Sequence, residues 1–227
     1  QTNQVATSSI NSDPLDEPFD AGTFRRIASE QTSTVVNIRT ESKQTPDVGN
    51  FGGDLFRRFF GQPAPQERPR EETVRASGTG FIIDPSGLIL TNNHVVAGGQ
   101  VILVENQSGD TVSAKLLGTD NVRDLAILKT ELETSNYWDI HSTTVPELGT
   151  QVYALGYPVS GNYSVTSGIL SSYVDLVGEN YPYAQTDAPL NPGNSGGPII
   201  DEKGKPISPK VVKTLGVGRP ECTKCSK

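Results

Sequence analysis

The chain has 227 residues, a formal net charge of −7, 34% apolar residues and 20% charged residues. A chain of this length can bury a sizeable core, as one large domain or as two small ones that share an interface. Its acidic balance lacks the electrostatic footprint of a nucleic-acid-binding protein, and the sequence has no run of about 18 apolar residues that could span a membrane.

The N-terminal part of the chain is predicted to hold an arm, a short helix and a first strand. Residues 1–18 are polar and rich in turn formers, which favours a flexible arm. Residues 20–30 follow a helical apolar pattern with Asp20 as the N-cap. The β-branched residues 34–38 indicate a strand, and the stretch 41–72 after it predicts a long loop.

The rest of the chain consists of short apolar segments separated by turn residues, which is typical of an all-β sandwich or a pair of barrels. The turn D-P-S-G of the first hairpin places Pro85 at its second position. The G-T-G of residues 78–80 lacks the third glycine of a dinucleotide-binding loop and does not open a helix, so we reject that function. The predicted strands are 77–84, 88–92, 101–105, 111–118, 124–129, 151–157, 163–172, 183–187 and 197–201.

The stretch L-N-P-G-N-S-G-G-P-I-I places Ser195 in a G-x-S-x-G pattern, which fits either a nucleophile on a tight turn or a flexible structural loop. A serine nucleophile needs a base, and the chain has two histidines, His94 and His141. The α/β-hydrolase fold requires a histidine after the serine, and none follows Ser195. The order His, Asp, Ser remains. We favour His94, at the end of an apolar strand, over His141, which has no flanking strand pattern.

The third member of such a triad is a carboxylate that orients the histidine. Asp124 begins a strand that looks buried on both faces, so its carboxylate would be desolvated and would need an imidazole N–H as partner. Asp84 and Asp120 lie in turns and have ordinary structural explanations. Asp187 is close in sequence to Ser195 and is more consistent with shaping a substrate pocket. We therefore select Asp124.

The glycines around Ser195 suggest an oxyanion hole. Acyl transfer produces an oxyanion that needs converging backbone N–H donors. Gly193 can adopt the unusual φ that aims its N–H beside that of Ser195, so we assign the hole to Gly193, Asn194 and Ser195. Gly196 and Gly197 leave room for a substrate backbone.

Three motifs in this order, T-N-N-H-V-V, R-D-L-A-I-L-K and Q-T-D-A-P-L-N-P-G-N-S-G-G-P, closely resemble the protease domain of the HtrA/Deg serine proteases of the trypsin-like superfamily. The resemblance covers about residues 19–202. It implies an all-β fold of two six-stranded antiparallel β-barrels with a short N-terminal helix. The corresponding protease domain is 19–215, with barrels at about 32–133 and 146–215, after the arm 1–18 and before an irregular tail 216–227.

The same resemblance implies an ATP-independent endopeptidase that cleaves misfolded or unfolded proteins in the periplasm or another extracytoplasmic compartment. It implies a homotrimer, no cofactor and no metal, with His94 and Asp124 from the first barrel and Ser195 from the second. Asp187, Pro189 and Leu190 would form the substrate pocket. Because Pro189, six residues before Ser195, is not acidic, small or medium apolar residues are expected before the cut.

The sequence departs from the family pattern after the serine motif. No PDZ domain follows, and the absence of methionine means that a signal or anchor segment would be missing. Pro206 and Pro209 stand where the family has its final strand, and proline is a poor residue in a central strand. Cys222 and Cys225 supply two of the four ligands that a zinc site needs. An impaired protease fold that acts as a chaperone or binding module is therefore the alternative function.

Overall fold

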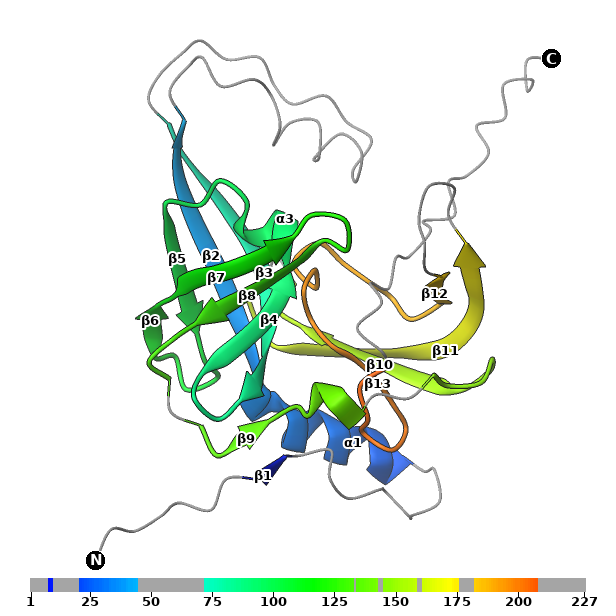
Figure 1. Cartoon of the computed structure of the whole chain (residues 1–227). Helices are drawn as coiled ribbons and strands as arrows, with labels where there is room; N and C mark the ends of the chain where they lie inside the picture. Colours follow the sequence, from blue (N-terminus) through cyan, green and yellow to red (C-terminus); the bar gives the residue numbers. More distant parts are fainter. Residues whose placement is uncertain are drawn as a thin grey trace, which may run out of the picture.

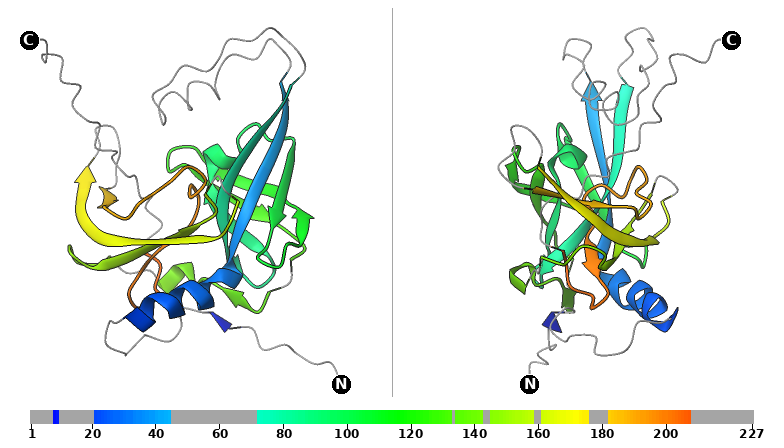
Figure 2. Two further views of the ribbon diagram at one scale, coloured as in Figure 1. Left: turned by 180° about the vertical axis from the view of Figure 1, so that it is seen from behind. Right: turned by 90° about the vertical axis from the view of Figure 1, so that its right-hand side faces the viewer.

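The computed structural model describes residues 8–9, 21–44, 72–132, 134–142, 145–158, 161–175 and 182–207. These residues form two large antiparallel β-sheets and one short parallel strand pair, with the helix α1 (Ala21–Glu30) lying across the base of both large sheets (Figure 1 and Figure 2). The two-unit, all-β architecture with a short N-terminal helix is thus confirmed. Asp20, most of the predicted arm and the tail lie outside the described residues.

The first sheet has seven strands and curls into a half-barrel (Figure 1). Its strands in sheet order are β6 (Thr111–Ser113), β5 (Val101–Glu105), β2 (Val35–Gln44), β3 (Glu72–Asp84), β4 (Leu88–Asn92), β8 (Leu125–Lys129) and β7 (Lys115–Asp120). The stretch 111–118, predicted as one strand, is divided between β6 and β7. At the division the N–H of Ala114 donates to the C=O of Ile102 at 2.9 Å.

The loop predicted for residues 41–72 is shorter in the structure, because strands β2 and β3 extend into it from both ends. The β2–β3 ladder continues until Gln44 pairs with Glu72. Within this extension Glu41 lies opposite Arg75, and their side chains form an ion pair of 3.1 Å. Opposite charges facing each other stabilise an antiparallel pair, so polar residues continue the ladder where the sequence shows no apolar pattern. Residues 45–71 lie outside the described part of the chain.

The second sheet has four strands among the described residues. In sheet order they are β12 (Pro182–Thr186), β11 (Ser164–Asp175), β10 (Gln151–Gly156) and β13 (Ile199–Asp201). All three pairings in this sheet are antiparallel. The long strand β11 therefore has β10 on one side and β12 on the other.

The chain turns back on β13 in the segment where the prolines made barrel closure doubtful. Two bonds join the arms of this turn, Asp201 N–H to Lys205 C=O at 2.9 Å and Ile207 N–H to Ile199 C=O at 2.8 Å. Pro206 lies between them and pairs with Ile200 in a single bridge. Neither bond needs the N–H that proline lacks. Pro206 therefore does not interrupt the pairing, contrary to expectation, whereas Pro209 lies outside the described residues.

A shared apolar core fixes the two sheets to each other. It consists of Ile27, Val35, Phe81, Leu90, Trp138, Tyr153, Leu155, Tyr157 and Ile200. Trp138 lies between the short strand β9 (Asn136–Tyr137) and the 3-10 turn η2 (Ile140–Ser142). It is fully buried, and its indole N–H donates to the hydroxyl of Thr34 at 2.6 Å. Close packing of this kind resists relative movement, so residues from different sheets keep defined positions at their junction.

Two smaller elements complete the described part of the chain. The pair of residues β1 (Ser8–Ser9) runs parallel to β9, and the 3-10 helix η1 (Gln31–Thr34) links α1 to β2. In the described ranges, no helix is both long and apolar enough to cross a membrane.

Candidate active site

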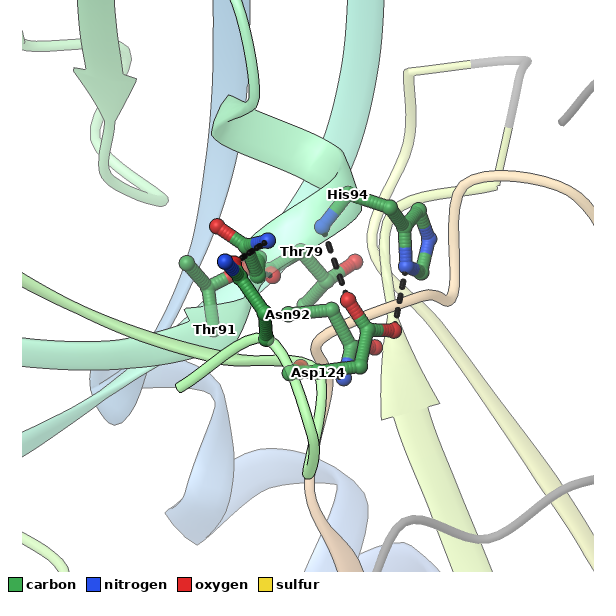
Figure 3. Close-up of polar contacts among 7 residues, drawn as sticks. Thr79, Thr91, Asn92, His94 and Asp124 are labelled. Carbon is green, nitrogen blue, oxygen red and sulfur yellow. Dashed lines mark hydrogen bonds and ion pairs between the residues drawn. The ribbon is translucent and has the colours of Figure 1, made fainter. Parts of the chain in front are cut away.

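His94 lies on the one-turn helix α3 (Asn93–Val96), which directly follows β4. Its ring Nδ1 is 2.6 Å from Oδ2 of Asp124, and its backbone N–H donates to Oδ1 of the same carboxylate at 2.8 Å (Figure 3). A carboxylate can only accept here, so Nδ1 carries the proton. The proton-accepting nitrogen of the neutral ring is then Nε2. The structure thus brings together the predicted base and the predicted carboxylate.

The backbone of Asp124 has an unusual conformation that its neighbours hold in place. Its φ is +55°, the single positive φ of a non-glycine residue within the described ranges. Its C=O accepts the N–H of Asn93 at 3.0 Å and the side-chain amide of Asn92 at 2.8 Å. Aspartate tolerates the left-handed region better than most residues, and the four bonds made by its C=O and carboxylate fix it there. Sequence reasoning missed Asn92, although the polar run T-N-N-H after an apolar strand was its signal.

The expectation that Asp124 begins a strand buried on both faces is wrong. Burial alternates along β8, and Ile127 remains 38% exposed. The side chains of His94 and Asp124 are 24% and 35% exposed. The reason is that β8 belongs to a curled antiparallel sheet with one face toward the core and the other toward solvent. The structure therefore places Asp124 in contact with His94, but the reason given for choosing Asp124 does not hold.

The alternative candidates lie in structural roles elsewhere. His141 is exposed on η2, and its backbone N–H donates to the Asp139 carboxylate at 2.9 Å. The other three carboxylates accept backbone N–H groups: Asp84 from Ser86 at 2.8 Å, Asp120 from Arg123 at 2.9 Å and Asp187 from Ile169 at 2.7 Å. The bonds within their own turns also lower the pKa of Asp84 and of Asp120. Neither turn carboxylate needs an imidazole partner.

Ser195 lies in the segment 191–197, which folds into two successive turns. The bonds that close them are Asn194 N–H to Asn191 C=O at 3.0 Å and Gly197 N–H to Asn194 C=O at 2.9 Å. The third residue of each turn is a glycine, with φ of +98° at Gly193 and +84° at Gly196. A positive φ at this position defines a type II turn and favours glycine. Ser195 is therefore held on a tight turn rather than in an extended loop.

The Ser195 turn packs against the first sheet at the junction of β4 and α3. A Cβ at Gly78 would lie 2.6 Å from a methyl group of Val95 and 3.2 Å from the C=O of Ser195. A Cβ at Gly196 would lie 2.9 Å from the backbone N of Asn92. Only glycine permits approaches this close. The orange segment of Figure 1 accordingly runs from β12 up to α3 before it returns to β13.

The three residues predicted for the oxyanion hole have different N–H environments. The N–H of Asn194 donates within the first turn. The N–H groups of Gly193 and Ser195 have no acceptor among the described residues. Asn194 therefore cannot donate its N–H to a substrate while this turn is intact, which corrects that part of the prediction.

The residues predicted for the substrate pocket lie on the segment between β12 and the Ser195 turn. Two of them accept hydrogen bonds from β11. Pro189 accepts the hydroxyl of Thr166 at 2.7 Å, and Asp187 accepts the N–H of Ile169. Leu190 is half-buried. Their part in a pocket stays a prediction.

Two antiparallel sheets that meet at a histidine–aspartate pair and a serine turn have the arrangement of the two-barrel serine peptidases. Comparison with known proteins agrees: the sequence profile of the trypsin-like peptidase domain matches residues 78–207. The chain belongs to this family.

Curated relatives and solved structures show which serine proteases the chain is similar to. Probable periplasmic serine endoproteases, DegP-like, from Hahella chejuensis (strain KCTC 2396) and Marinomonas sp. (strain MWYL1) are each 38% identical to the chain and match 81% of it. The chain spans 41% and 42% of the lengths of these two relatives. The solved structure of the HtrA-type protease AlgW with decapeptide matches 81% of this chain and 57% of its own, with 32% identity and a TM-score of 0.60.

Proposed function

We propose that the chain is an ATP-independent serine endopeptidase that cleaves misfolded or unfolded proteins. Ser195 is the nucleophile, His94 the general base and Asp124 the residue that orients the base. The observation that carries the proposal is the double contact of the Asp124 carboxylate with His94, at 2.6 Å and 2.8 Å. Both bonds help to hold Asp124 in its positive-φ conformation, and the bond to Nδ1 also fixes the tautomer and the ring orientation, as a catalytic base requires.

The proposed reaction proceeds in two halves. Oγ of Ser195 attacks the scissile carbonyl carbon while Nε2 of His94 takes the hydroxyl proton. The tetrahedral intermediate then collapses, the C–N bond breaks, and His94 gives that proton to the leaving amine. In the second half His94 deprotonates a water that attacks the acyl ester, and Ser195 regains its proton as the ester bond breaks.

The conformation of the serine turn supports an oxyanion hole made by the N–H groups of Gly193 and Ser195. The positive φ of +98° at Gly193 is the conformation assumed for aiming its N–H beside that of Ser195. Each such donor typically contributes about 10²- to 10³-fold to kcat. The proposal places no metal and no cofactor in the site.

The finer features of the function rest on the relatives. Their names, probable periplasmic serine endoproteases, support a periplasmic or extracytoplasmic location for this chain. Unfolded proteins as substrates, a homotrimer as the assembly and a preference for small or medium apolar residues before the cut belong to the same proposal. We keep 19–215 as the extent of the protease domain. The chaperone alternative loses one of its reasons, since pairing continues past Pro206.

The direct test uses the whole chain with an unfolded substrate. We expect the purified protein to cleave casein without nucleotide, to leave a stably folded protein of similar size intact, and to be labelled by a fluorophosphonate at Ser195, as located by peptide mass spectrometry. Absence of both cleavage and labelling would overturn the proposal. Labelling at another serine would show that the nucleophile is misassigned.

The substitution Asp124→Asn tests the orienting role without changing the backbone. Asparagine tolerates the positive φ of this position, but its amide group can present N–H rather than oxygen to Nδ1 of His94 and so select the wrong tautomer. We expect kcat to fall about 10⁴-fold, measured with a chromogenic peptide, while circular dichroism stays unchanged. A fall of less than about tenfold would contradict the assignment.

A further inference from the structure

We propose that Thr79, in the middle of β3, is a positioning residue that fixes the conformation of the Ser195 turn through its hydroxyl group. The inference rests on the proposed function and adds a residue that lies outside the triad and the oxyanion hole. It also gives a role to the G-T-G motif of residues 78–80, which is not a dinucleotide-binding loop.

Strand alternation aims Thr79 at the junction between the two sheets. Its neighbours Gly78 and Gly80 point to the opposite face, where a Cβ would lie 2.6 Å from Val95 and 2.7 Å from Ile38, respectively. Both glycines thus let β3 approach the core and α3 closely. Thr79 itself is completely buried, and the methyl carbon of its side chain would be 3.1 Å from a Cβ at Gly197.

Every polar atom of Thr79 is used, and three of its four bonds reach the second sheet or the serine turn. Its backbone N–H donates to the C=O of Ser195 at 2.8 Å, and its C=O accepts the hydroxyl of Thr91 at 2.7 Å. Its hydroxyl donates to the C=O of Gly193 at 2.6 Å and accepts the N–H of Tyr157 at 2.8 Å. A hydroxyl has a single proton, and the Tyr157 N–H can only donate. The proton of Thr79 is therefore committed to the Gly193 C=O.

These bonds fix the peptide planes on both sides of the one that carries the Ser195 N–H. The bond to the Gly193 C=O fixes the plane between Gly193 and Asn194, and the bond to the Ser195 C=O fixes the plane between Ser195 and Gly196. The plane between them is held by the C=O of Asn194, which accepts the N–H of Gly197. Because each peptide plane is rigid, fixing these three determines the direction of the Ser195 N–H and limits the rotation available to Gly193.

The hydroxyl is therefore expected to matter for the transition state more than for substrate binding. Without it the buried Gly193 C=O and Tyr157 N–H lose their partner, and unpaired buried groups relax toward other partners. The turn would then deviate by a fraction of an ångström, which is enough to weaken stabilisation of the developing oxyanion.

The test compares Thr79→Val, which keeps the shape but removes the hydroxyl, with Thr79→Ser, which keeps the hydroxyl. The matched control is Thr130→Val. Thr130 is equally buried, and its hydroxyl also donates to a C=O and accepts an N–H, but at the Gly87 turn. Each variant is assayed for kcat and KM on a peptide substrate, for inhibition by a peptide boronic acid and for melting temperature.

We expect Thr79→Val to lower kcat about 10- to 100-fold and to weaken boronic acid inhibition in parallel, with KM within about threefold of the parent value. Thr79→Ser should stay within about threefold in kcat, and Thr130→Val should lose stability but keep its activity. Should Thr79→Val not fold, Thr79→Ala removes the same hydroxyl without adding bulk and carries the same expectation. Equal kcat values in the Thr79→Val and Thr130→Val variants, or equal loss in Thr79→Ser, would overturn the inference. An inactive parent chain would instead refute the proposed function.

Discussion

Replacement of Ser195 by alanine is expected to lower kcat for casein or peptide hydrolysis by about 10⁶-fold, to the background of the assay. The substitution removes a single oxygen. The second position of a type II turn accepts alanine as readily as serine, so the turns closed by Asn194 and Gly197 should remain. The loss would therefore report chemistry rather than folding. The measurements are steady-state hydrolysis and fluorophosphonate labelling, which should both vanish.

The matched control is Ser171→Ala, on the exposed part of β11, which should keep full activity. The same Ser195→Ala protein also distinguishes the two candidate functions. If the chain were only a binding module, the parent and the Ser195→Ala variant would suppress substrate aggregation equally and neither would cleave. Turnover by Ser195→Ala within about tenfold of the parent would show that another group is the nucleophile.

The order of three short motifs was sufficient to predict the class of fold and the contact between His94 and Asp124. A serine peptidase site needs a base, an orienting carboxylate and a serine turn, and each imposes residue types that are visible in the sequence. The glycines of N-P-G-N-S-G-G-P are a clear case. Two of them adopt a positive φ, and Gly196 also approaches another backbone too closely for any side chain. Such requirements are local, so a single sequence displays them.

The contacts that the sequence did not reveal depend on strands that are distant along the chain. Thr79 is 114 residues from the Gly193 C=O that it binds, and no local sequence pattern predicts such a bond. The exposure of Asp124 depends on how the first sheet curls, and the continuation of β2 and β3 depends on facing side chains such as Glu41 and Arg75. Pro206 looked disruptive because the sequence does not show which of its neighbours make the ladder bonds.

The second prediction concerns the two histidines, of which only His94 should be essential. His94→Ala is expected to lower kcat by about 10⁶-fold, because no other described titratable group is bound to the Asp124 carboxylate. His141→Ala should leave kcat within about twofold of the parent value. Its side chain is exposed on η2, and its backbone N–H, which alanine retains, donates to Asp139.

Chemical rescue makes this comparison sharper than loss of activity alone. The ring of His94 is 24% exposed, so its removal leaves a space that solvent molecules can reach next to Asp124. Added imidazole should therefore restore part of the kcat of His94→Ala, and it should do nothing for Ser195→Ala, in which the nucleophile is missing. If His141→Ala were the inactive variant and His94→Ala the active one, the base would be misassigned. The contact of His94 with Asp124 would then be structural, and the catalytic site would have to lie near η2.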